Sequence, residues 1–196
     1  MKIIHNFNQS LQNERNHALN ADKFYSDILG ATELRRFSSD NDEDMYYQKQ
    51  DIDVEITLNG KTYRISEKFR EKDFGDLYIE FFSMYPDVPG WMETGSPNAI
   101  MYFTPENAYW ISHRSLKHFY QNTLSPLIKK DWFEEIYKSG ETIKSKQINV
   151  GGKIYKISII QAHNHSKVSW KTIGISIPFQ WLEDANVRFK RFNIQS

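Results

Sequence analysis

An Asn-Gly pair at positions 59 and 60 constrains the fold more than any other feature of the sequence. It lies between the runs Ile52 to Leu58 and Thr62 to Phe69, in which apolar and polar side chains largely alternate. Asn-Gly favours a tight turn whose two central residues both have positive φ, and this turn joins antiparallel strands. The sequence therefore predicts a β-hairpin formed by these two runs.

Several further elements are expected around this hairpin. Apolar residues recur at three- and four-residue steps from Ser10 to Leu29 and predict an amphipathic helix that stops at Gly30. The acidic segment from Ser38 to Asp44 predicts an exposed loop, and Asp76 to Phe82 a third strand of the same sheet. Later strands are expected over residues 99–103, 109–112, 153–161 and 172–178, and later helices over 115–121 and 126–139.

Size and composition limit the classes of protein that the chain can belong to. Its 196 residues correspond to about one domain. The 25 basic and 25 acidic side chains balance, so that contact with nucleic acid would need a local basic patch. The absence of cysteine excludes thiolate ligands and nucleophiles, and any metal would be held by oxygen or imidazole. No apolar run resembles a signal peptide or a membrane span, so we expect a cytoplasmic protein.

Charged residues occupy strand positions that are usually apolar. On the first strand of the hairpin, Asp53 shares a face with Asp51 and Glu55, two side chains that we expect to be solvated. On the second strand, Glu67 interrupts the apolar row of Ile65 and Phe69, where an unpaired charge would be costly. Carboxylates beside a lysine are the parts of a metal-dependent site for phosphodiester cleavage, because Mg²⁺ binds oxygen ligands.

An ordered set of motifs lies between Gln48 and Trp110. In chain order these are Ile52-Asp53, the Asn-Gly hairpin, Ile65-x-Glu67-Lys68-x-Arg70, Asp73-Phe74-Gly75-Asp76 and Glu80. This order resembles the PD-(D/E)XK nuclease superfamily and, within it, phage and prophage-type members with an EKxR core. The resemblance implies one α/β domain of the α+β type, with a restriction-endonuclease-like mixed central sheet flanked by helices. Its core would cover about residues 10–121, followed by a C-terminal extension over about 122–196.

The resemblance also implies roles for individual residues. Asp53 and Glu67 match the two carboxylates that bind Mg²⁺, for which Mn²⁺ can substitute, and Lys68 matches the catalytic lysine. These three residues would form the catalytic set. The resemblance also implies supporting roles for four further residues. Gln48 and Arg70 would bind the substrate, and Asp76 and Glu80 would contact and orient the metal ligands.

The adjacency of Glu67 and Lys68 departs from the pattern of the superfamily, which has one residue between the two. Ideal strand alternation sends adjacent side chains to opposite faces. Either a β-bulge re-aims one of them, or Ser66 occupies the usual carboxylate position and the carboxylate function moves to Glu67 or Glu80. The sequence leaves both arrangements open.

Two functions therefore follow from the resemblance. The first is a Mg²⁺-dependent endo- or exonuclease of phage or bacterial origin that hydrolyses DNA. The second is a catalytically inactive nuclease-fold module that binds DNA in packaging, recombination or defence. Both imply a nucleic acid as partner and no membrane, and both are compatible with a homodimer.

Overall fold

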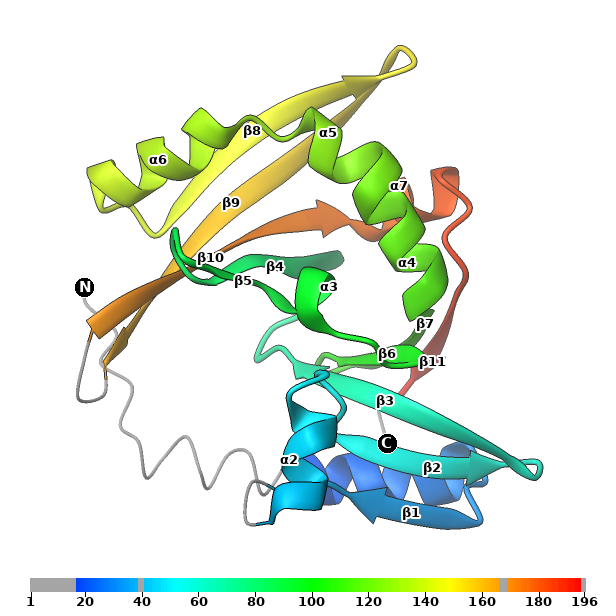
Figure 1. Cartoon of the computed structure of the whole chain (residues 1–196). Helices are drawn as coiled ribbons and strands as arrows, with labels where there is room; N and C mark the ends of the chain where they lie inside the picture. Colours follow the sequence, from blue (N-terminus) through cyan, green and yellow to red (C-terminus); the bar gives the residue numbers. More distant parts are fainter. Residues whose placement is uncertain (1–16, 39–40, 166–168, 195–196) are drawn as a thin grey trace.

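The computed structural model of the chain describes residues 17–38, 41–165 and 169–194. Within these residues it contains two β-sheets with helices around them (Figure 1). The six-stranded sheet A has the order β1 (Glu33–Arg36), β2 (Val54–Leu58), β3 (Lys61–Phe69), β6 (Ala99–Phe103), β7 (Asn107–Ser112) and β11 (Phe189–Asn193). The five-stranded sheet B has the order β5 (Val88–Pro89), β4 (Asp76–Met84), β10 (Ser169–Pro178), β9 (Lys153–His165) and β8 (Ile143–Val150).

The predicted N-terminal helix is confirmed over its described part. Residues 17–23 are α-helical and lead into the π-helical turn η1 (Phe24–Ile28), and Gly30 follows with a φ of 72°. The expected start of this helix, residues 10–16, lies outside the described residues. The later helices are α2 (Asp42–Gln48), α3 (Trp91–Thr94), α4 (His113–Phe119), η2 (Tyr120–Leu124), α5 (Ser125–Leu127), α6 (Lys130–Ser139) and α7 (Phe179–Asp184).

The predicted hairpin is also confirmed. β2 pairs antiparallel with β3 in an unbroken register from the pair Val54 and Ile65 to the pair Leu58 and Lys61. Asn59 and Gly60 have φ angles of 49° and 72°, so both central residues of the turn have the positive φ that a type I′ hairpin requires. The turn chemistry and the alternation of side chains therefore act together to fix this register.

Two clusters of buried apolar side chains hold the molecule together. The smaller one lies between the N-terminal helix and one face of sheet A and includes Tyr25, Val54 and Ile65. The larger one includes Ile79 of β4 and Ile100 of β6, so that sheets A and B share it. Sheet A is mixed, because β3 and β6 are parallel while its other neighbouring strands are antiparallel. The chain thus forms one mixed α+β domain.

The third predicted strand exists, but the sheet assigned to it was wrong. β4 does not extend the hairpin; it lies in sheet B between β5 and β10, and the second neighbour of β3 is β6. The buried residues Leu77, Ile79 and Phe81 alternate with partly exposed ones, as in any strand with one apolar face. Such a pattern identifies a strand, but it carries no information about the strand that pairs with it.

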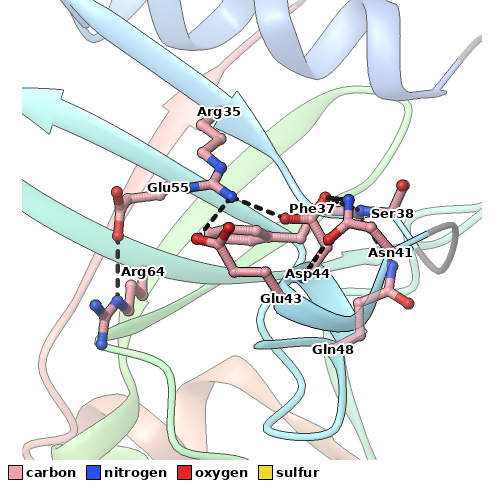
Figure 2. A network of polar contacts seen from close by, with 9 residues as sticks. All are labelled: Arg35, Phe37, Ser38, Asn41, Glu43, Asp44, Gln48, Glu55 and Arg64. Atoms are coloured by element: carbon pink, nitrogen blue, oxygen red, sulfur yellow. Dashed lines mark hydrogen bonds and ion pairs between the residues drawn. The ribbon is translucent and has the colours of Figure 1, made fainter. Parts of the chain in front are cut away.

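The acidic segment from Ser38 to Asp44 differs from the expected loop in its second half. Asn41 caps the start of α2, because its side-chain oxygen accepts the backbone N–H of Asp44 at 2.8 Å. Asp44 itself is buried and accepts hydrogen bonds from the Ser38 backbone and from Arg35 (Figure 2). Carboxylates in the first turn stabilise a helix through its dipole. The acidic residues therefore begin a helix, in which Asp42 and Glu43 face solvent and Asp44 is buried.

The C-terminal third of the chain is part of both sheets. β10 pairs with β4 from Asp76 to Phe82, and β11 pairs with β7 along its whole length. The segment predicted as an extension thus supplies the neighbours of strands that belong to the expected core. Among the described helices, none is long and apolar enough to cross a membrane.

Candidate functional site

Strand β3 places Glu67 and Lys68 on opposite faces of sheet A. Residues Ile65 to Phe69 pair with β6 in continuous register, so the β-bulge that could have re-aimed one side chain is absent from this strand. Glu67 lies on the face of Ile65, which packs with the N-terminal helix. Lys68 lies on the other face with Ser66. The structure therefore does not bring the two side chains together.

The buried carboxylate of Glu67 forms an ion pair with the partly exposed Arg36. Arg36 donates two hydrogen bonds to it, from Nη1 to Oε2 at 2.7 Å and from Nη2 to Oε1 at 3.2 Å. The hydroxyl of Tyr25 donates to Oε1 at 2.8 Å, and Arg36 also binds Asp22. Burial and the nearby Glu67 charge raise the pKa of Tyr25 well above its ordinary value. The negative charge of Glu67 is thus compensated by an arginine from β1.

Five residues around Lys68 form what we call the Lys68 cluster: Asp51, Asp53, Ser66, Lys68 and Glu80. At its centre, Lys68 Nζ donates to Asp51 Oδ1 at 2.7 Å, and Ser66 Oγ donates to Asp51 Oδ2 at 2.6 Å. The backbone N–H of Glu67 donates a hydrogen bond to Asp53 Oδ2 at 2.7 Å. Asp51 thus takes the place beside Lys68 that the resemblance assigns to Glu67.

Two carboxylates of the cluster have raised pKa values. Desolvation raises the pKa of Asp53 to about 6, against the opposing effect of the Lys68 charge. Desolvation also raises the pKa of Glu80, again opposed by Lys68. The negative charge of Asp51 raises both values further. The carboxylates of Asp51, Asp53 and Glu80 therefore share the single positive charge of Lys68. The partly buried cluster keeps a net negative charge when all three carboxylates are ionised.

Sheet B and α3 complete the surroundings of the cluster. Glu80 comes from β4, and Gly90 lies so close to it that a Cβ at position 90 would be 2.1 Å from the Glu80 carbonyl oxygen. Only glycine allows this approach, which positions Trp91 at the start of α3. Lys68 Nζ lies 5.5 Å from the centroid of the buried Trp91 ring. Trp91 therefore packs against the lysine of the cluster.

Asp51 is the residue of the cluster that sequence reasoning missed, because a solvated strand residue was expected. Its φ of 56° lies in the left-handed region, which is uncommon for residues other than glycine and which aspartate tolerates. Asp51 follows α2 in a turn, and its backbone N–H donates to the Gln48 carbonyl oxygen. Backbone strain of this kind is concentrated at functional sites. No spacing rule in the sequence indicates it.

The remaining predicted residues lie outside the Lys68 cluster and have other partners. The Gln48 side chain donates to the Phe37 carbonyl oxygen at 3.0 Å, within the polar network around α2 in Figure 2, and does not reach the cluster. Arg70 lies directly after the end of β3 and pairs with Asp76 at 3.4 Å. Desolvation raises the pKa of Asp76, and the Arg70 charge opposes this shift. Asp76 therefore contacts the predicted substrate residue rather than the metal ligands.

No metal site with three side-chain ligands is found among the described residues. The described residues contain no group of three or more His, Asp or Glu side chains that could hold a metal ion. Mg²⁺ is usually bound by one or two carboxylates and leaves its other positions to water and substrate phosphate. Both oxygens of Asp51 accept hydrogen bonds from Lys68 and Ser66, which leaves Asp53 and Glu80 as the other carboxylates of the cluster.

Comparison with known proteins adds no relative from which a function could be transferred. No protein-family model, curated protein or solved structure matches the chain. The function is therefore inferred from the geometry and charge of the residues themselves.

The raised pKa of Asp53 leads to a prediction about stability. A carboxyl that titrates near pH 6 when folded and near 3.8 when unfolded binds its proton more tightly in the folded state. Its contribution to stability is complete below about pH 4 and is lost as the pH rises to about 6. Urea unfolding should show a loss of about 1 to 2 kcal/mol across this range, after allowance for partial exposure, that Asp53→Asn does not show. Identical pH profiles of the two proteins would contradict this.

Proposed function

We propose that the protein is a Mg²⁺-dependent nuclease that hydrolyses phosphodiester bonds of DNA at the Lys68 cluster. The observation that carries this proposal is a lysine in direct contact with Asp51 and surrounded by the carboxylates of Asp53 and Glu80. The mixed sheet A, with the N-terminal helix on one face, supports a restriction-endonuclease-like arrangement. The proposal keeps Asp53 and Lys68 from the sequence analysis and moves Glu67 to a structural role.

Asp53 and Glu80 would hold the metal. Each is a desolvated carboxylate with a raised pKa, and a divalent cation would compensate the negative charge that Lys68 leaves in the cluster. When bound, Mg²⁺ supplies Lewis-acid stabilisation of the phosphate and lowers the pKa of a coordinated water. This assignment corresponds to the arrangement in which Ser66 occupies the usual carboxylate position and Glu80 provides the second carboxylate.

Lys68 would act on the reacting phosphate. Its ammonium group is fixed on one side by Asp51 and packs over the Trp91 ring, so that it is oriented before substrate arrives. A preoriented cation stabilises the charge that develops on the phosphate oxygens as water attacks and the ester bond breaks. Asp51 in turn is fixed by Ser66, which makes it a positioning residue for Lys68.

Metal binding tests this proposal most directly. Calorimetric titration with Mn²⁺ should give an affinity at least about tenfold weaker, or 1.4 kcal/mol, for Asp53→Asn and for Glu80→Gln. The matched control is Glu55→Gln, because Glu55 lies on the adjoining strand β2 and pairs with Arg64 at 3.1 Å. Its affinity should equal that of the wild type. Unchanged binding by Asp53→Asn would remove the metal assignment.

Cleavage is measured in parallel. Duplex, branched and single-stranded DNA and RNA are incubated with the protein and Mg²⁺, and EDTA provides the reference. Mg²⁺-dependent product from a DNA substrate supports the nuclease. Metal binding without cleavage of any of these substrates would favour the inactive nucleic-acid-binding module instead.

A further inference from the structure

The turn between β3 and β4 presents an aromatic ring to solvent at Phe74. The side chain is 64% exposed, whereas most large rings of this chain are buried or half-buried. The guanidinium carbon of Arg70 lies 5.4 Å from the centroid of the Phe74 ring and 5.6 Å from that of Tyr78. One cation therefore contacts an exposed ring and a largely buried one.

The turn that carries Phe74 is fixed to sheet A. Asp73 Oδ1 accepts the backbone N–H of Gly75 at 2.8 Å. Asp73 Oδ2 accepts hydrogen bonds from Thr104 Oγ1 at 2.9 Å and from Asn107 Nδ2 at 2.8 Å. Gly75 has a φ of 67°, which the tight turn requires. A ring held in this way loses little conformational entropy when a partner packs against it.

Basic side chains alternate with other residues in the sequence from Lys68 to this ring, and Glu71 and Asp73 are among those others. Lys68, Arg70 and Lys72 follow one another at alternate positions, and Lys72 is exposed. An aromatic ring beside cations is the combination that binds an unpaired nucleotide, because the base stacks on the ring while the cations attract the phosphates. In an intact duplex the bases are stacked on each other and cannot reach such a ring.

We propose that Phe74 is a stacking platform for an unpaired base, and that the substrate of the Lys68 cluster is single-stranded or locally unpaired nucleic acid. This inference rests on the proposed function, because it names the substrate class of the same site. Arg70 would place the adjoining phosphate, in agreement with the substrate contact expected for it from the sequence. Phe74 would determine the preference for unpaired over paired nucleic acid.

The test is a binding measurement in EDTA, so that no cleavage is needed. A short single strand that contains 2-aminopurine should lose fluorescence when its base stacks on the protein. Phe74→Leu should bind this strand about tenfold more weakly, in the range expected for one base–aromatic stack, and should lose the quenching. Phe74→Trp should restore both, because it restores a flat ring.

Tyr137→Leu is the matched control. Tyr137 on α6 is also an exposed ring beside a cation, with Lys171 Nζ at 4.1 Å from its centroid, and it lies on sheet B. Equal affinities of the wild type and Phe74→Leu would overturn the inference, and so would a duplex that binds as tightly as the single strand. Phe74-dependent binding without Mg²⁺-dependent cleavage would support the stacking platform and contradict the nuclease. Mg²⁺-dependent cleavage together with binding that does not depend on Phe74 would support the nuclease and contradict the stacking platform.

Discussion

Replacing Lys68 with alanine is expected to slow Mg²⁺-dependent cleavage by about a hundred- to a thousand-fold, or roughly 3 to 4 kcal/mol of transition-state stabilisation. The reason is that Lys68 is the cation of the cluster and is fixed by Asp51 at 2.7 Å. Asp53 and Glu80 remain in place, so Mn²⁺ binding should persist. Single-turnover kinetics and calorimetry on the same preparation check both statements.

A lysine in an ordinary ion pair provides the control for this experiment. Lys153 pairs with Asp184 at the surface of the molecule. An exposed pair of this kind contributes under about 1 kcal/mol to stability, so Lys153→Ala should cleave like the wild type. If Lys68→Ala cleaves as fast as the parent protein, the catalytic role of Lys68 is wrong. If the parent protein cleaves none of the substrates offered, the binding module becomes the better description.

Replacing Glu67 with alanine is expected to lower the free energy of unfolding by about 2 to 3 kcal/mol, because it removes a buried carboxylate that accepts hydrogen bonds from Tyr25 and from the partly exposed Arg36. Arg36 would keep its charge without its main partner, and the buried hydroxyl of Tyr25 would lose its acceptor. The folded fraction of the variant should retain Mn²⁺ binding and cleavage, because Glu67 is not one of the proposed metal ligands and its backbone N–H, which donates to Asp53, is kept in the variant. Urea unfolding and activity per folded molecule measure the two effects separately.

Glu55→Ala is the matched comparison for Glu67→Ala. Glu55 also forms a carboxylate–arginine pair within sheet A, with Arg64 at 3.1 Å, but that pair is partly exposed. Its loss should cost under about 1 kcal/mol. A Glu67→Ala protein with unchanged stability and no cleavage would return Glu67 to the catalytic set that the resemblance implied.

Local patterns predicted the elements of this fold better than their partners. The Asn-Gly turn and the alternation around it fixed the register of β2 and β3 in advance, because both signals lie within the paired residues. The partner of β4 is β10, about a hundred residues later in the chain. The pairing of distant strands depends on which apolar faces meet in the shared core. The residues of one strand do not show which other strand will pair with it.

The site shows the same division. Strand alternation already placed Glu67 and Lys68 on opposite faces, and the structure confirms this simplest arrangement. The ion-pair partner of Glu67 is Arg36 on β1, a strand that the sequence did not reveal. Asp51 escaped detection because its role depends on a left-handed backbone conformation. Period-two reasoning assumes extended backbone and fails at such a residue.

The Lys68 cluster spans the boundary between the two sheets, since Lys68 comes from sheet A and Glu80 from sheet B. The spacing between ammonium and carboxylate therefore depends on how the sheets dock, and not only on the strands that carry these residues. β4 is held in place by β10, which belongs to the last third of the chain. A shortened protein that ends near residue 121 would keep every member of the cluster and lose the strand that fixes one of them. The C-terminal third thus helps to position Glu80, although none of the five residues of the Lys68 cluster comes from it.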